Sequence, residues 1–271
     1  MRLNEIFSVG KPVIRMLHLD YLAGQKEYRG FEYTLSRALV DLYNLQDGGI
    51  DGILIENWKE YTTAPEADPK NVECMLEISR ELAKRAKVPL GISVLNNDYK
   101  AVFRISKEIG ARFVQLDVYV DKVRSEFEFN PYTKEHPFDI IVDPKDVLKY
   151  KPENVALFVS IQPKHYVLLE KNKPIELSAK QAIENKTDAI IVTGEKTGIA
   201  PSLEKIRKVK QAVGNYPVGI GIGFSRRDAT DYFPEIDFVI VGTDLKYESR
   251  TDNPVDIERV RELMDIVRKF R

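Results

Sequence analysis

Eight short apolar segments are spaced along the chain and separated by longer amphipathic segments. Each apolar segment is nearly continuous and rich in β-branched residues, as expected of strands buried on both faces rather than strands with one solvent face. They lie at 12–19, 51–57, 89–95, 113–119, 154–161, 188–194, 217–224 and 237–245. This pattern restricts the chain to folds built on a large, mostly parallel sheet.

The segments between most of these strands carry apolar residues at steps of three and four, the period of a helix with one buried face. Residues 31–47 show this clearly, with Leu35, Leu39 and Leu42 in register before the glycine pair that begins at Gly48. Residues suited to helix N-caps precede several of these segments. They are Asn71, Asp98, Ser202 and Asn253.

Strands that alternate with helices at this spacing are expected to be parallel and joined by right-handed crossovers. We therefore predict an α/β fold, a (β/α)8 TIM barrel, as a single domain over residues 1–271. A doubly wound open sheet is the alternative. The first strand is not followed by the GxGxxG motif of dinucleotide-binding sheets, which argues against it.

The alternation is interrupted after the fourth strand by an extended insert, approximately residues 120–153. Connections of this length in compact domains are often functional lids. Residues 127–132 and 137–142 alternate in hydrophobicity, which predicts a small hairpin near the barrel mouth, and residues 145–151 predict a short helix.

Composition excludes several classes of protein. Lys and Arg number 41 and Asp and Glu 42, so there is no charge excess to favour nucleic acid or an anionic membrane. No apolar segment approaches the roughly 20 residues of a membrane helix, and the first residues do not resemble a signal peptide. The single cysteine, Cys74, occupies an apolar helical position and is interpreted as a buried, inert thiol. These features predict a cytoplasmic protein with no integral membrane segment, and they leave homo-oligomerisation open.

Polar residues gather at the C-terminal ends of the predicted strands, where barrels of this kind carry their active sites. Four of them are candidate catalytic residues: His18, Glu56, Asp117 and Lys164. His18 could transfer protons, and either carboxylate could serve as a general base. Lys164 could be an electrophile, a phosphate ligand or a Schiff-base amine. The alternative for each carboxylate is a salt bridge in the barrel mouth.

Glycines in the last two strands predict a phosphate cradle, because backbone N–H groups without a neighbouring side chain can approach phosphate oxygens closely. Gly221, Gly223, Gly242 and Thr243 would form it. The alternative is that these glycines relieve crowding inside the barrel. Further candidate substrate-binding residues follow other strands: Asn57, Asn97, Thr193, Gly194 and Thr197. Asp98 is interpreted as a helix cap in preference to a ligand-binding residue.

No metal-binding motif of fixed spacing occurs, and no sequence motif requires a cofactor. We therefore predict no metal site, and the cofactor stays undefined. Metal-assisted hydrolysis with His18, Glu56 and Asp117 is a further alternative, although their spacing does not demand it.

Several blocks of sequence together resemble the BtpA family, also called BtpA/SgcQ. They are MLHLDYLAG at 16–24, IDGILIENW at 50–58, VLNND at 94–98, PKH at 163–165, DAIIVTGEKTG at 188–198 and VGTDLKYESRTDNPVD at 241–256. The resemblance implies a TIM barrel of the phosphate-binding kind. The positions that match the family are His18, Glu56, Asn57, Asn97, Asp98, Lys164, His165, Thr193, Gly194, Thr197, Gly198, Gly242, Thr243 and Lys246.

The chain departs from the family pattern at the side of the barrel whose residues would determine the reaction and the substrate. Asp20 and Tyr21 replace a Pro-Pro pair, and Trp58, Lys59 and Glu60 replace Phe-Gly-Asp. Three further strand ends also differ, at Asn96 in place of Arg, at Gln115 and Asp117 in place of Arg and Asn, and at Ser160 in place of Asp. These changes indicate a divergent member with altered specificity or one that has lost activity.

The leading functional hypothesis is an enzyme that acts on a small phosphorylated metabolite by isomerase, aldolase or lyase chemistry. A phosphoribosylanthranilate-isomerase-like reaction is one version, weakened because Met16 and His18 stand where that enzyme's base cysteine is expected. The alternative is a non-catalytic assembly or regulatory factor that uses the barrel as a binding scaffold.

Overall fold

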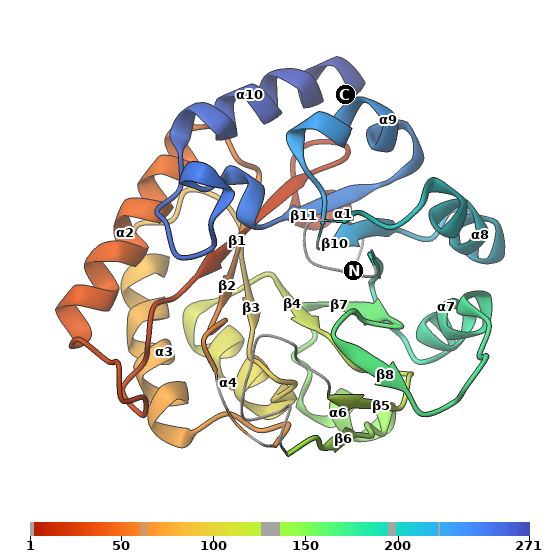
Figure 1. Ribbon diagram of the computed structural model, residues 1–271, viewed down its shortest axis with the longest axis horizontal. Helices are drawn as coiled ribbons and strands as arrows, with labels where there is room; N and C mark the ends of the chain where they lie inside the picture. Colours follow the sequence, from red (N-terminus) through yellow and green to blue (C-terminus); the bar gives the residue numbers. More distant parts are fainter. Residues whose placement is uncertain (1–2, 61, 63, 126–135, 195–198, 222) are drawn as a thin grey trace.

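Eight parallel strands close into a barrel in the computed structural model, which describes residues 3–271 apart from 61, 63, 126–135, 195–198 and 222 (Figure 1). Their spatial order is β1-β2-β3-β4-β7-β9-β10-β11, and β1 pairs with β11 to complete the ring. The bounds are β1 Val13–His18, β2 Gly52–Glu56, β3 Leu90–Ser93, β4 Phe113–Leu116, β7 Ala156–Ile161, β9 Ala189–Thr193, β10 Val218–Gly221 and β11 Phe238–Val241. The predicted barrel is therefore confirmed over the open sheet.

Helices surround the strands (Figure 1). They are α1 Leu3–Ile6, α2 Phe31–Asp47, α3 Pro69–Ala83, α4 Tyr99–Ile109, α6 Pro144–Tyr150, α7 Ile175–Glu184, α8 Leu203–Val213, α9 Ala229–Tyr232 and α10 Ile257–Val267. Short 3-10 turns lie at Arg226–Asp228, Phe233–Glu235, Thr243–Leu245, Tyr247–Ser249 and Arg268–Phe270. None of the helices in the described part of the chain is long and apolar enough to cross a membrane.

The barrel interior is filled by aromatic and branched side chains. Phe158 lies between Phe113 and Phe238, with ring centroids 5.2 and 5.1 Å away. Glycine at position 91 makes room for this layer, because a Cβ there would lie 2.2 Å from the Phe113 ring. Phe7, from the segment after α1, closes the N-terminal end against Phe113 at 5.6 Å. The N-terminal end is therefore packed with apolar groups, which leaves the other end for polar chemistry.

The insert and the segment after β7 together form a small antiparallel sheet with strand order β6-β5-β8. Its strands are β5 Val123–Ser125, β6 Asp139–Ile140 and β8 Tyr166–Leu168. Because β5 follows β4 and β8 follows β7, the sheet is connected to the C-terminal ends of two barrel strands. Val118, Val123 and Ile140 form its own buried apolar cluster. One predicted hairpin arm, 127–132, falls almost wholly outside the described residues, and the sequence did not indicate the third strand, β8.

Candidate active site at the barrel mouth

Two carboxylates face the mouth from the ends of β2 and β4. Burial, with a smaller contribution from the nearby charge of Asp117, raises the pKa of Glu56 to about 8. Burial also raises the pKa of Asp117. Ser93 Oγ donates a hydrogen bond to Glu56 Oε2 at 3.3 Å, and Gln115 Nε2 donates one to Asp117 Oδ1 at 3.0 Å. Carboxyl groups that titrate near neutrality are suited to proton transfer.

Lys164 and Tyr166 reach the same region from the segment after β7. Burial lowers the pKa of Lys164 to about 8, against the opposing effect of the Asp117 charge. Burial raises the pKa of Tyr166, and the charges of Asp117 and Glu56 raise it further. The Tyr166 hydroxyl donates to the backbone oxygen of Asn96 at 3.2 Å. The sequence prediction missed Tyr166, although it lies two residues after Lys164.

His18 lies beside Glu56, with Nε2 3.8 Å from Glu56 Oε1. Burial lowers the pKa of His18 well below its ordinary value, and the charges of Arg15 and Lys246 lower it further. Its imidazole is therefore neutral at neutral pH. Nδ1 is buried and has no hydrogen-bond partner among the described residues. A neutral imidazole in this position has one nitrogen toward Glu56 and another available to a ligand.

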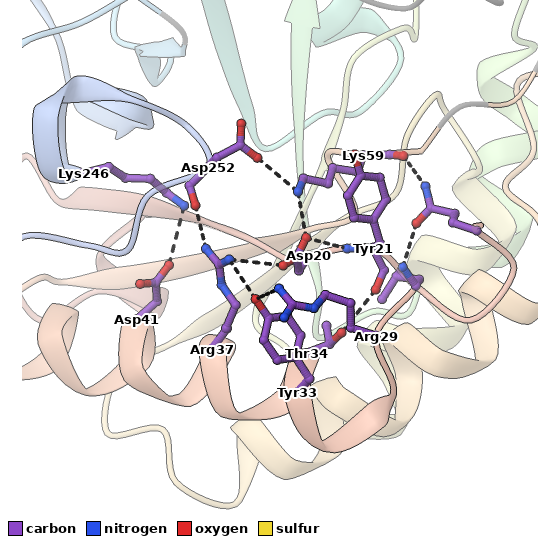
Figure 2. A network of polar contacts seen from close by, with 12 residues as sticks. Asp20, Tyr21, Arg29, Tyr33, Thr34, Arg37, Asp41, Lys59, Lys246 and Asp252 are labelled. Atoms are coloured by element: carbon purple, nitrogen blue, oxygen red, sulfur yellow. Dashed lines mark hydrogen bonds and ion pairs between the residues drawn. The ribbon is translucent and has the colours of Figure 1, made fainter. Parts of the chain in front are cut away.

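A narrow polar cleft adjoins His18 on its other side, and we call it the cation cleft (Figure 2). Its lining residues are His18, Asp20, Arg37, Asp41, Trp58, Lys59, Lys246, Thr251 and Asp252. Figure 2 labels Asp20, Arg37, Asp41, Lys59, Lys246 and Asp252 among them. Lys59 Nζ lies 2.7 Å from Asp20 Oδ1 and 3.0 Å from Asp252 Oδ1. Arg37 Nη1 lies 3.2 Å from Asp20 Oδ2, and Lys246 Nζ lies 3.6 Å from Asp41 Oδ2.

Arg15 lies next to the cleft and is fully buried. None of its three guanidinium nitrogens has a hydrogen-bond partner among the described residues. Burial lowers its pKa to about 10, although the charges of Asp41 and Glu56 oppose this. Burial and the charge of Arg15 lower the pKa of Lys246 to about 8. The sequence prediction also missed Arg15, whose signal was a lone arginine inside an apolar strand.

The predicted glycine cradle divides into two parts. A Cβ at Gly242 would meet only His18 Cε1, at 3.7 Å, among the described atoms. At Gly221 it would lie 2.7 Å from Ile191, and at Gly223, where φ is +90°, 2.1 Å from the backbone oxygen of Ile199. Close packing thus explains why residues 221 and 223 are glycines, which is the alternative given for them in the sequence analysis. Gly242, in contrast, borders open space.

Gly194 and Thr193 follow β9. A Cβ at Gly194 would lie 1.8 Å from the Ile199 oxygen, so this glycine also allows close packing. Thr193 Oγ1 accepts a hydrogen bond from the Lys164 backbone N–H at 3.0 Å. Thr243 Oγ1 lies 2.9 Å from Thr251 Oγ1, which connects the cradle to the cation cleft. The predicted residue Thr197 lies outside the described residues.

The predicted asparagines hold the mouth loops together. Asn57 Oδ1 accepts from Leu95 N–H at 2.7 Å. Asn97 donates to the Val118 oxygen and accepts from the Val118 N–H, both at 2.9 Å. Asp98 caps α4 by accepting from the Ala101 N–H at 2.9 Å. These contacts position the loops that carry Glu56 and Asp117.

In the part of the chain that the structure describes, no three His, Cys, Asp or Glu side chains converge closely enough to hold a metal ion. We refer to the titratable residues grouped at the mouth, which are His18, Glu56, Asp117 and Lys164, as the acid–base set. The cation cleft lies beside it.

Comparison with known proteins gives relatives along almost the whole chain. The model of the BtpA family matches residues 9–269. An uncharacterized protein of Thermococcus kodakarensis is 27% identical, covering 96% of this chain and 97% of the relative. The Photosystem I biogenesis protein BtpA of Synechocystis sp. is 26% identical over 96% of this chain and 89% of its own. The putative sgc region protein SgcQ of Escherichia coli is 24% identical over 99% and 98%.

Solved structures share the fold at low sequence identity. A tryptophan synthase chain from Mycobacterium tuberculosis superimposes with a TM-score of 0.58 at 14% identity, covering 96% of this chain and 92% of the other. A phosphoribosyl anthranilate isomerase from Thermus thermophilus gives 0.56 at 12% identity, covering 96% and 100%. At these identities the likeness shows the barrel alone.

Proposed function

The chain belongs to the BtpA family, and we propose that it is an enzyme that moves protons on a small phosphorylated metabolite, in an isomerase, aldolase or lyase reaction. The observation that carries this proposal is the grouping of Glu56, Asp117 and Lys164 at the barrel mouth, each with a pKa displaced toward neutrality. Displaced pKa values at the C-terminal end of a barrel are typical of catalytic groups.

The two carboxyl groups have different surroundings and therefore different roles. Glu56, with a pKa of about 8, holds its proton at neutral pH and is the general acid. The Lys164 charge lowers the pKa of Asp117 against the effect of burial, so Asp117 is the more readily ionised group and the general base. Two carboxyls whose environments separate their protonation states form an acid–base pair.

These roles suit removal of a proton from a carbon next to a carbonyl. Asp117 takes that proton, and negative charge develops on the carbonyl oxygen. The Lys164 ammonium stabilises this charge, and Glu56 supplies a proton to the oxygen or to the neighbouring carbon. The phosphate group binds on the β11 side, where Gly242 borders open space.

The proposal is tested with a panel of sugar phosphates, including an amino-sugar phosphate, in D2O. We expect at least one compound to raise the melting temperature and to incorporate deuterium next to its carbonyl in the presence of the protein. Glu56→Gln and Asp117→Asn are expected to abolish the incorporation and to retain the thermal shift. The exposed Glu73→Gln variant is the control and should keep both.

A different result would favour the second candidate, a binding scaffold. Its support is the name of the Synechocystis relative, a photosystem I biogenesis protein, together with the departures from the family pattern. Absence of any thermal shift and of any deuterium incorporation across the panel would refute the enzymatic proposal.

A further inference from the structure

The cation cleft brings together basic side chains from separate parts of the chain. Arg37 comes from α2, Lys59 from the segment after β2, and Lys246 from the segment after β11. Lys59 and Lys246 are buried, with 9% and 2% of their surfaces exposed. Long side chains of this type are rarely buried unless an anion compensates them. The cleft is therefore built to hold negative charge.

The carboxylates that compensate these cations differ in how firmly they are held. The side chains of Asp20, in the segment after β1, and of Asp41, in α2, are 9% and 7% exposed. Asp252 is 62% exposed and touches Lys59 from above, while its backbone oxygen accepts from Arg37 Nη2 at 2.6 Å (Figure 2). An ion pair with so exposed a partner contributes little to stability. Asp252 is therefore the carboxylate whose displacement from Lys59 costs the least free energy.

Asp252 belongs to a loop of residues 247–254 that is tied at its base. Lys246 pairs with Val255 across the base, and the Tyr247 N–H donates to the Pro254 oxygen at 3.1 Å. Beyond this tie, residues 247–250 and 252 are exposed. Two further loop residues are also held: Thr251 Oγ1 lies 2.9 Å from Thr243 Oγ1, and Ser249 Oγ accepts from Arg259 Nη1 at 2.6 Å. Rotation of the exposed Asp252 side chain would therefore withdraw its carboxylate while the loop stays in place.

Withdrawal of Asp252 would leave the cleft with an excess of positive charge. Among the described residues, the carboxylates that remain paired with Arg37, Lys59 and Lys246 would then be Asp20 and Asp41. Adjacent to them, Arg15 is fully buried, and its guanidinium has no hydrogen-bond partner among the described residues. Four cations against two carboxylates leave two charges, which a phosphate dianion would neutralise.

We propose that Asp252 is an internal counter-ion that occupies the seat of the ligand's phosphate group and is displaced from Lys59 when that group binds. The proposal rests on the proposed function for the phosphorylated nature of the ligand. It places the phosphate between β11 and β1, next to Gly242, with His18 between the phosphate and Glu56. A rotation of the Asp252 side chain away from Lys59 then accompanies binding.

The test is calorimetric titration of the full chain with inorganic phosphate at neutral pH and fixed ionic strength. Asp252→Asn removes the competing charge, so we expect it to bind phosphate about two- to fivefold more tightly than the unaltered protein, the equivalent of one exposed ion pair. Asp265→Asn makes the same change in net charge on α10, away from the cleft, and should bind like the unaltered protein.

Lys59→Met is expected to weaken phosphate binding by at least about tenfold, because it removes a buried cation that faces the anion. Its folding is checked by circular dichroism, and Arg37→Gln repeats the test at a side chain that is 37% exposed. Phosphate binding by Asp252→Asn that equals or falls below that of the unaltered protein would overturn the proposal, as would absence of phosphate binding in every variant.

The outcomes for the two proposals can be told apart. Tighter phosphate binding by Asp252→Asn without deuterium incorporation in any sugar phosphate supports the counter-ion and counts against the enzyme. Deuterium incorporation that depends on Glu56 but is indifferent to Asp252 and Lys59 supports the enzyme and refutes this seat for the phosphate.

Discussion

At the scale of single residues, Glu56 links the chemistry of the mouth to the stability of the fold. A buried carboxyl with a pKa raised from 4.5 to about 8 keeps its proton in the folded state under conditions where the unfolded chain has lost it. Its contribution to stability is complete below pH 4.5, and it is lost as the pH rises through 8.

This reasoning gives a prediction for Glu56→Gln, whose amide does not titrate. Between pH 5 and 8, the free energy of unfolding of the variant is expected to rise relative to that of the unaltered protein by up to about 1.4 kcal/mol per pH unit. Above pH 8 the difference should level off. Urea unfolding at each pH measures it, and a difference between the two proteins that does not change with pH would contradict the assigned pKa.

Arg15 gives the second prediction. A fully buried guanidinium that has no hydrogen-bond partner among the described residues costs desolvation energy that those residues do not offset by hydrogen bonding. Arg15→Met is therefore expected to leave the free energy of unfolding unchanged or to raise it by about 1–2 kcal/mol, while phosphate affinity falls. Urea unfolding and the phosphate titration measure the two effects. A loss of several kcal/mol in the variant would show that Arg15 serves the fold rather than a ligand.

The sequence indicated some of these residues and not others, for a physical reason. His18, Glu56 and Lys164 follow apolar strands directly, so the strand pattern alone places them at the mouth. Arg15 lies within a strand, and Tyr166 lies in a strand of the insert. Their positions depend on which elements pack against them, which the local pattern does not specify.

At the scale of elements, the loop after β9 is shaped by close backbone contacts. Gly194 and Gly223 both face the backbone oxygen of Ile199, at distances that leave no room for a Cβ. The sequence predicts Gly223 as part of the phosphate cradle, with relief of crowding as the alternative, and Gly194 as a substrate-binding residue. The contact with Ile199 could not be predicted, because residues 199 and 223 are adjacent only in the folded chain.

Gly223→Ala provides the third prediction. The added methyl group would lie 2.1 Å from the Ile199 oxygen at a residue with φ of +90°, so backbone must move. We expect a loss of about 3 kcal/mol or more in the free energy of unfolding, from steric strain added to the positive φ. Gly110→Ala is the matched control, since φ is +68° there and no described atom lies within 4 Å of the new Cβ; it should lose only about 1–2 kcal/mol. Equal losses in urea unfolding would refute the contact.

The N-caps of the helices also could not all be predicted from the local sequence pattern. Asp98 and Ser202 cap α4 and α8, as predicted. Helix α3 is capped by Asp68 rather than by Asn71, because Pro69 suits a first helical turn, and α10 is capped by Asp256 rather than by Asn253. Several side chains near each start are competent caps, and the choice among them depends on where the helix meets the barrel.

At the scale of the whole molecule, the apolar residues that close the barrel and the candidate catalytic residues lie at opposite ends of it. Eight apolar strands alternating with helices were enough to predict the fold. Ring closure by β1 and β11 joins residues more than two hundred positions apart, and it follows from the strand number rather than from any local signal. The apolar end is closed by Phe7, and the polar end carries the acid–base set and the cation cleft.

This separation leads to the last prediction. Phe7 is 2% exposed and packs against Phe113 beneath the barrel, at the end opposite to Glu56. Phe7→Ala is expected to lower the free energy of unfolding by about 3–5 kcal/mol, because it opens a cavity in a dense aromatic layer. Phosphate affinity should stay unchanged at temperatures where the variant is folded. Urea unfolding and phosphate titration measure the two properties, with the half-exposed Tyr150→Ala as a control that should change neither by much. A fall in phosphate affinity of the folded Phe7 variant would show that the two ends of the barrel are coupled, contrary to the division that the packing implies.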